Sequence, residues 1–441
     1  MKVFFREVRG NLYYTLRFLA LAGVTGLVVG AVSVIFARLD QIASGARQNF
    51  PLIILALPVA GLLIVYLYHL AGAYKPRGTN LVFLTVQNKE ALPVRMAPLI
   101  FVSTILTHLC GGSVGREGAA LQLGGALGSG LGKIQGLNFS DEDKRLLVMC
   151  GMSAAFSAIF GTPVAAAIFP LEVVNIGILQ YSMLLPCAFS SLVAVRLAYH
   201  CGVEGEGLHF AAPPPLEAVE ALKVMALAFC CAILSILFCK LLKYSHMVFA
   251  SIHESQYVQI IVGGVLFLII TAFTYYIGAP RYMGAGMDVI MGATKGDAYW
   301  FDCFFKMLLT AICIGSGFKG GEIVPSLFIG ATFGSFFAGM VGLPPSLGAS
   351  CGMAALFCGV TNCPISSLLI ISELFGFNQG GLYFLLSVAI SFVMSGYFGL
   401  YSAQRIAYSK FRPRYIDRIP GAYDDELELG DATLDKSNLN S

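Results

Sequence analysis

Two glutamates in glycine-rich turns have the setting in this chain that most suggests chemistry. Glu117 lies in "GGSVGREGAALQLGG" (111–125), after an apolar run, and Glu322 lies in "GSGFKGGEIVPSLFIGATFG" (315–334). A glycine-rich turn that leads into a helix leaves backbone N–H groups unpaired, and the positive end of the helix dipole points toward whatever lies in front of it. Each turn is therefore a candidate anion site with a titratable carboxyl beside it.

A carboxylate beside an anion site can control that site and also carry a proton. When Glu117 is ionised it competes with the anion for the same donors, and protonation removes the competitor. Charged residues within membrane segments are costly and indicate function by default. Two structural alternatives stay open: Glu117 could form an ion pair with Arg116 at a loop end, and Glu322 could be a helix N-terminal carboxylate satisfied by its own dipole.

Composition places these turns in a membrane. The 441 residues are 57% hydrophobic and only 12% charged, and mean hydropathy is +0.77, whereas soluble domains carry about 25% charged residues. A net charge of +3 does not indicate nucleic acid as a partner. The twelve cysteines include no C-x-x-C pair, which predicts reduced thiols, no metal site and no cofactor.

The elements that must hold the turns are apolar stretches of uneven length. A simple span needs about 20 apolar residues, so the stretch 364–376 is too short to cross alone, and Gly or Pro interrupts many others. Broken helices are tolerated at membrane depth only where they are buried in protein or line a cavity. We expect an all-α polytopic membrane protein of tilted, broken helices.

Basic residues predict the orientation of the chain. They flank the first apolar stretch, which shows no signal cleavage pattern, and they follow the last one: Lys2, Arg6, Arg9, Arg17, Arg405, Lys410, Arg412, Arg414 and Arg418. This bias predicts a multi-pass protein of the cell membrane with both termini cytoplasmic.

An internal repeat divides the chain. "GMSAAFSAIFGTPVAAAIFPLE" (151–172) and "GMAALFCGVTNCPISSLLIISE" (352–373) share Gly-Met, Phe, Pro and Glu at identical offsets, and an acidic, Pro-rich segment at 201–218 separates them. Both follow a Gly-x-Glu turn, Gly115 to Glu117 and Gly320 to Glu322. Two halves with interrupted helices are typical of a transporter whose site lies at their interface. We expect halves at 1–212 and 213–402 and a short, largely disordered cytoplasmic tail at 403–441.

A second interpretation of the first turn is chemical. Residues 111–115 spell G-x-S-x-G with Ser113 at its centre, and a nucleophile elbow of this kind requires a preceding strand with His and Asp or Glu partners. The preceding run has a length compatible with a helix, and nothing in the spacing directs His108 at Ser113. An intramembrane serine hydrolase is therefore the remote alternative, and we expect no catalytic residues and no enzyme.

Three stretches in this order resemble the CLC family of anion channels and proton-coupled anion exchangers: 111–125, 315–334 and "GLYSAQRI" (399–406). The resemblance covers roughly residues 10–405 and its motifs are specific. The GREGP motif appears as Gly115, Arg116, Glu117, Gly118 and Ala119. The GxFxP motif appears as Gly321, Glu322, Ile323, Val324 and Pro325, the central tyrosine as Tyr401, and a weaker GSGIP match as Gly78, Thr79, Asn80, Leu81 and Val82.

The resemblance implies a fold, an assembly and a site. It implies two inverted-topology halves and a homodimer with one anion path per subunit, and no paired nucleotide-binding (CBS) domain fits in the tail. It assigns gating and proton transfer to Glu117 and Glu322. It assigns anion binding to Thr79, Asn80, Gly115, Arg116, Gly118, Ile323, Val324 and Tyr401. From the residues alone, an interfacial anchor is the favoured role for Tyr401, and Thr79 and Asn80 could equally serve a turn or an N-cap.

Departures from the family pattern point to one branch of it. The chain reads "FPLEVV", so Val173 stands where chloride-type exchangers carry an inner glutamate, while Glu322 adds a carboxyl to the second motif. This combination resembles the fluoride/proton antiporters. Fluoride is small and strongly hydrated, and a protonated Glu322 could donate a hydrogen bond to it. We expect a halide transporter that exchanges fluoride for protons across the bilayer; the alternative is chloride/proton exchange or passive chloride conduction.

Overall fold

The computed structural model describes residues 2–73, 77–134, 139–205, 207–208, 213–215, 217–276, 281–377 and 380–420, with backbone only for 2–10. Within these residues the chain forms sixteen α-helices and three short strands. The predicted junction, 201–218, therefore lies partly outside the described residues.

Helices dominate both parts of the chain. The first part contains α1 (Lys2–Asn49), α2 (Leu57–Leu70), α3 (Thr79–Val86), α4 (Met96–Leu109), α5 (Glu117–Leu131), α6 (Asp141–Phe160), α7 (Pro163–Val173) and α8 (Leu184–His200), with 3-10 turns at Pro51–Ala56 and Tyr181–Met183. The second contains α9 (Ala218–Ile252), α10 (Gln256–Tyr276), α11 (Met287–Thr294), α12 (Asp302–Ser316), α13 (Ile323–Val341), α14 (Pro345–Thr361), α15 (Pro364–Phe375) and α16 (Gly381–Met394).

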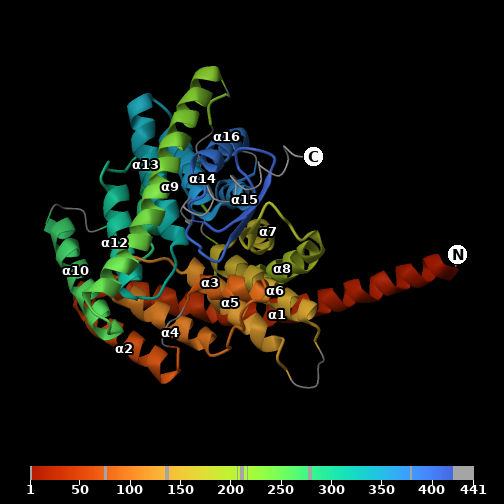
Figure 1. Cartoon of the computed structure of the whole chain (residues 1–441). Coiled ribbons are helices and arrows are strands. Elements are labelled where there is room, and N and C mark those ends of the chain that lie inside the picture. Colours follow the sequence, from red (N-terminus) through yellow and green to blue (C-terminus); the bar gives the residue numbers. More distant parts are fainter. Residues whose placement is uncertain are drawn as a thin grey trace, which may run out of the picture.

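The helices differ in whether they can cross a membrane. Six helical segments of the described residues are long and apolar enough to do so, while α4, α7, α14, α15 and α16 are apolar but shorter. The predicted short piece is α15, which has only 12 residues. The expectation of an all-α membrane protein with broken helices is therefore confirmed. Most of the first part of the chain lies below the second part in Figure 1, and the two meet at the centre.

The sequence repeat marks equivalent breaks between helices. In the first copy α6 ends where Gly161 turns with φ +76°, and α7 then begins with a proline. In the second copy α14 ends at Asn362 with φ +60°, and α15 begins with Pro364. A left-handed residue ends a helix, and proline is favoured in the first turn of the next one. The shared offsets of the repeat therefore encode two helix breaks of the same design.

Glycines allow each repeat to pack closely on the helix before it. A Cβ atom on Gly124 of α5 would collide with the backbone of Gly151 on α6, and one on Gly330 of α13 would collide with the backbone of Gly352 on α14. Small residues at helix interfaces let two backbones approach closely within a membrane. The helices that follow the two glycine-rich turns, α5 and α13, each belong to one of these close helix pairs.

The acidic ends of the two repeats exchange contacts. Glu172, at the end of α7, accepts hydrogen bonds from two backbone N–H groups at the start of α15 (2.9 and 2.7 Å). Glu373, at the end of α15, accepts two from the start of α7 (2.9 and 2.8 Å). A carboxylate at a helix N-terminus satisfies unpaired donors and opposes the positive end of the dipole. Each repeat thus caps the broken helix of the other.

Part of the predicted tail is ordered. Strand β2 (Arg405–Tyr408) pairs antiparallel with β3 (Tyr415–Arg418) and parallel with β1 (Asn175–Ile176), which follows α7. The side chain of Gln404 also donates to two backbone carbonyls, those of Val173 and Thr361 (2.8 and 2.7 Å). A largely disordered tail is thus the wrong prediction for 405–418, because pairing with a distant strand satisfies this backbone. Residues 421–441 lie outside the described residues.

Candidate functional site

The two glycine-rich turns meet at the centre of the molecule. Gly115 and Gly321 exchange two backbone hydrogen bonds, of 2.7 and 2.6 Å, as an isolated antiparallel bridge. Next to this bridge, a Cβ atom on Gly118 would approach the Cα of Gly321 to 2.8 Å, which only glycine avoids. The N-terminal ends of α5 and α13 therefore converge, as the sequence predicts.

The bridge pairs the two turns in a register that differs by one residue from the one the Gly-x-Glu pattern predicts. The Gly-x-Glu pattern matches Gly115 with Gly320, but the hydrogen bonds pair Gly115 with Gly321. Glu117 thus lies two residues after its bridging glycine, whereas Glu322 lies one residue after its own. An offset of one residue rotates a side chain by about 100° around a helix axis. The two carboxyls are therefore not equivalent in space.

Glu117 is buried at the start of α5, with 1% of its surface exposed. Its Oε2 accepts a hydrogen bond from the backbone N–H of Arg116 (3.0 Å), and its Oε1 lies 3.5 Å from Arg116 Nε. The ion pair considered as a structural alternative is therefore present. It leaves the carboxylate at the positive end of the helix, where it takes up donors that an anion would use.

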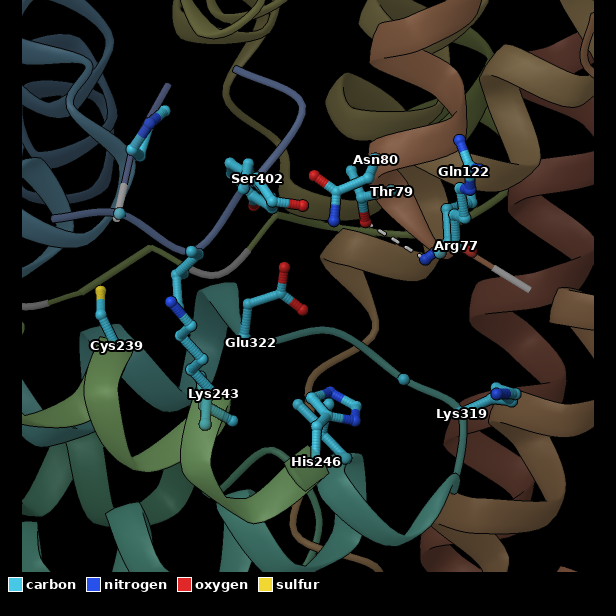
Figure 2. Close-up of a pocket in the computed structure, with 18 of the residues that line it drawn as sticks. Arg77, Thr79, Asn80, Gln122, Cys239, Lys243, His246, Lys319, Glu322 and Ser402 are labelled. Atoms are coloured by element: carbon cyan, nitrogen blue, oxygen red, sulfur yellow. Dashed lines mark hydrogen bonds between the residues drawn. The ribbon is translucent and has the colours of Figure 1, made fainter. Parts of the chain in front are cut away.

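Glu322 precedes α13 and lines a cavity of ≈570 Å³. Figure 2 shows its carboxyl on the side of Asn80, Thr79 and Ser402. Tyr401 lines the same cavity and has 1% of its surface exposed. Such burial does not fit an interfacial anchor, because an anchor places its hydroxyl at the membrane surface.

The start of α3 positions Thr79 and Asn80. Gly78 turns the chain into this helix with φ +57°, a conformation that favours glycine. Thr79 Oγ1 accepts a hydrogen bond from Gln122 of α5 (3.2 Å), and Asn80 Oδ1 accepts one from the backbone N–H of Ala403 (2.9 Å). These contacts join the predicted polar segment both to the first turn and to the loop that carries Tyr401.

The other predicted anion-binding residues do not line this cavity. Ile323 and Val324 are fully buried in the first turn of α13, and Gly115 and Gly118 lie at the bridge. Gly118, Ile323 and Val324 can serve an anion only through backbone N–H groups, and the N–H of Gly115 already donates to Gly321. The side chain of Arg116 turns instead toward Asp40 of α1, with 3.4 Å between its Nη1 and the Asp40 Oδ2.

Sequence reasoning missed the basic lining of the cavity. Side chains from three segments contribute to it, namely Arg77, Lys240, Lys243, His246 and Lys319, with Gln122 and Ser402 as further polar residues. Among the residues that the structure describes, Glu322 is the one acidic residue that lines it. A cleft lined by one sign of charge concentrates the opposite ion. The spacing of Lys240, Lys243 and His246 on one face of a helix was the available signal.

The geometry does not support the hydrolase alternative. A helix, α4, precedes the G-x-S-x-G sequence where a nucleophile elbow requires a strand. Ser113 Oγ lies 3.2 Å from Thr310 Oγ1, and His108 Nε2 has no hydrogen-bond partner among the described residues. Within the described part of the chain, Ser113 therefore has no base in contact with it.

Comparisons with known proteins agree with this geometry. Residues 60–396 match the model of the voltage gated chloride channel family. A protein of Pseudomonas syringae pv. tomato named "Chloride/fluoride channel protein" is 34% identical over 90% of this chain and 88% of its own length. An "H(+)/Cl(-) exchange transporter ClcA" of Vibrio vulnificus is 26% identical over 81% of each chain.

A solved structure gives the same result in three dimensions. The crystal structure of a CLC-type fluoride/proton antiporter superposes with a TM-score of 0.83 and 31% identity, over 89% of this chain and 98% of that one. The chain therefore belongs to the voltage gated chloride channel family, and it is a CLC-type anion transporter of the membrane.

Proposed function

We propose that this protein exchanges a halide, fluoride by preference, for protons. The observation that carries the proposal is the Glu322 carboxyl, which faces the cavity among Thr79, Asn80 and Tyr401. Fluoride gives up its hydration shell only where strong donors replace it. A protonated carboxyl, a phenol and an amide offer such donors, and the carboxyl can also release a proton. The names of the Pseudomonas protein and of the solved antiporter support the same choice.

The residues divide into three roles. Glu117 is the gate: ionised, it fills the helix end, and protonated, it leaves this place to the anion. Glu322 and Tyr401, with Thr79 and Asn80, contact the anion through their side chains. Gly118, Ile323 and Val324 contribute backbone N–H donors at the helix starts. Gly115 joins the two turns through its bridge to Gly321, and Arg116 holds Glu117.

The proposal extends to the organisation of the chain. Two inverted halves, 1–212 and 213–402, are supported by the bridge between their turns and by the reciprocal capping through Glu172 and Glu373. We propose a homodimer, with one path per subunit, that lies in the cell membrane with both termini cytoplasmic. Its activity is transport, and Ser113 contacts Thr310 of α12.

Chloride/proton exchange or passive chloride conduction is the second candidate. Val173, which is fully buried, stands where a chloride-type exchanger has its inner glutamate, so the chloride-type proton relay is missing. This absence fits an uncoupled path as well as the fluoride branch, and the name "channel" of the Pseudomonas relative fits it too.

Flux from liposomes decides between the candidates. The purified protein is reconstituted, and efflux of fluoride and of chloride is measured with ion-selective electrodes while external pH is followed. We expect fluoride efflux to exceed chloride efflux and to drive proton uptake. Equal rates for the two anions would contradict the fluoride preference, and anion flux without proton movement would contradict exchange.

A further inference from the structure

A buried carboxylate and imidazole lie beside the gate but outside the cavity. Asp40 of α1 and His108 at the end of α4 are 4% and 1% exposed, and Asp40 Oδ1 lies 2.8 Å from His108 Nδ1. Neither residue lines the cavity. The proposed exchange gives this pair no part.

The pair is linked to Glu117 through one side chain. Asp40 Oδ2 lies 3.4 Å from Arg116 Nη1, and Arg116 Nε lies 3.5 Å from Glu117 Oε1. Arg116 is thus shared between two buried carboxylates, one on α1 and one at the start of α5. His108 contacts the far side of Asp40, so four side chains form a chain from imidazole to gate.

The charges around these four side chains favour a guanidinium that is shared between the two carboxylates. Arg47 donates a hydrogen bond to the backbone carbonyl of His108 (2.5 Å) and interacts electrostatically with Asp40 and with Asp288 of α11. Lys306 of α12 lies near Arg47 and donates to two backbone carbonyls. Asp40 therefore faces cations from its own helix and from α5. A buried charge left without its partner is strongly destabilising.

Protonation of the gate changes this balance. With Glu117 ionised, Arg116 is balanced by two carboxylates. With Glu117 protonated, Asp40 still balances Arg116, so the guanidinium is not left buried without a counter-charge. Without Asp40 the full pull of Arg116 would act on Glu117 and would favour its ionised form.

We propose that Asp40 and His108 are positioning residues that set the pH at which the Glu117 gate opens. The inference rests on the proposed role of Glu117. Asp40 takes up Arg116 when the gate is protonated, and the His108 ring, whose Nδ1 lies 2.8 Å from Asp40 Oδ1, holds Asp40 in place. Its Nε2 is buried without a hydrogen-bond partner among the described residues, so no side chain continues the contact beyond the ring. His108 therefore orients Asp40 and does not itself carry the transported proton.

The test is the pH profile of fluoride-driven proton uptake in liposomes. In Asp40→Asn, the proton concentration for half-maximal uptake should rise about tenfold. The pH at the midpoint of the profile should therefore fall by about one unit. Glu117→Gln provides the reference, because this variant should move fluoride without proton uptake. Adding Asp40→Asn to Glu117→Gln should cause no further change in proton uptake. If Glu117→Gln stays coupled, the proposed function fails. If it is uncoupled while folded Asp40→Asn keeps the wild-type midpoint, only the present inference is overturned.

Two substitutions of His108 keep the test open if Asp40→Asn does not fold. The Asn side chain can donate from nearly the position of Nδ1, whereas Phe cannot donate. His108→Asn should keep the midpoint within about twofold in proton concentration, and His108→Phe should shift it in the direction of Asp40→Asn. A His108→Asn variant that loses coupling as fully as Glu117→Gln would show that the imidazole carries protons, which would overturn the proposal.

Discussion

The two glycine-rich turns share a backbone plan and hold their glutamates in opposite ways. Glu117 is folded back on the N–H of Arg116, is almost fully buried, and is paired with a guanidinium that Asp40 also engages. Glu322 points into a basic cavity beside Tyr401. Similar local sequences thus produce a closed carboxylate in one half and a cavity-facing carboxyl in the other.

The register of the bridge explains this difference. Because Gly115 pairs with Gly321, the position of Glu117 corresponds to Ile323, and that of Glu322 corresponds to Arg116. The two halves therefore carry their carboxyls at adjacent, not identical, positions of two equivalent turns. Inverted halves can in this way give one path two acidic groups of different exposure, which suits two different steps of an exchange.

Substitution of the closed carboxylate should have the largest effect. Glu117→Gln cannot change its charge, so proton uptake driven by fluoride should fall to background, and anion flux should lose its rise toward low pH. The rise has this sign because protonation opens the gate. Proton uptake and fluoride efflux are measured together between about pH 5 and pH 8, where most protein titrations of physiological interest lie. A variant that keeps wild-type coupling would remove Glu117 from its role.

Substitution of the cavity-facing carboxyl should have a different and smaller effect. Glu322→Gln keeps an N–H donor but neither takes nor releases a proton, so fluoride efflux should fall about tenfold, equivalent to about 1.4 kcal/mol in barrier height. Chloride efflux should change less. The ratio of the two anion fluxes is the measurement. An unchanged ratio would show that Glu322 does not discriminate between halides, and the comparison between the two turns would lose its functional meaning.

The phenol beside Glu322 should contribute one hydrogen bond. Tyr401→Phe keeps the ring, which packs edge-on against Phe83 at 5.0 Å, and removes only the hydroxyl. One hydrogen bond is worth about 0.5–1.5 kcal/mol, so fluoride efflux should fall about two- to tenfold. The midpoint of thermal unfolding should stay close to wild type, which separates lost binding from lost packing. Unchanged fluoride efflux would leave the Tyr401 hydroxyl without a contact to the anion.

The basic lining should have the smallest effect, and that effect should depend on salt. Lys243→Met and Lys319→Met together remove two of the cavity's cations, so anion flux at low ionic strength should fall about two- to threefold through weaker attraction of the ion. Near 1 M salt the Debye length is about 3 Å, and the difference should vanish. Lys144→Met, which removes an exposed lysine paired with Asp141 outside this cavity, is the matched control. A deficit that persists at high salt would point to a direct contact.

Much of the local structure could be predicted. The prolines and glycines of the repeat predicted helix breaks that the structure places at Gly161 and Asn362, because such residues act through their own backbone. The close helix pairs were not predicted, although the G-x-x-x-G spacings Gly124–Gly128 and Gly330–Gly334 were available as a signal. The order of 405–418 had no such signal, since it depends on pairing with β1.

The sequence by itself determined the membrane setting, the two glycine-rich turns and the presence of a carboxyl in each, because composition and glycine spacing act over a few residues. Only the tertiary structure decided which glycines pair, where Arg116 points, and that α9 brings lysines to Glu322. These contacts join segments about eighty to two hundred residues apart. No local periodicity specifies them, because they follow from how the two halves pack against each other.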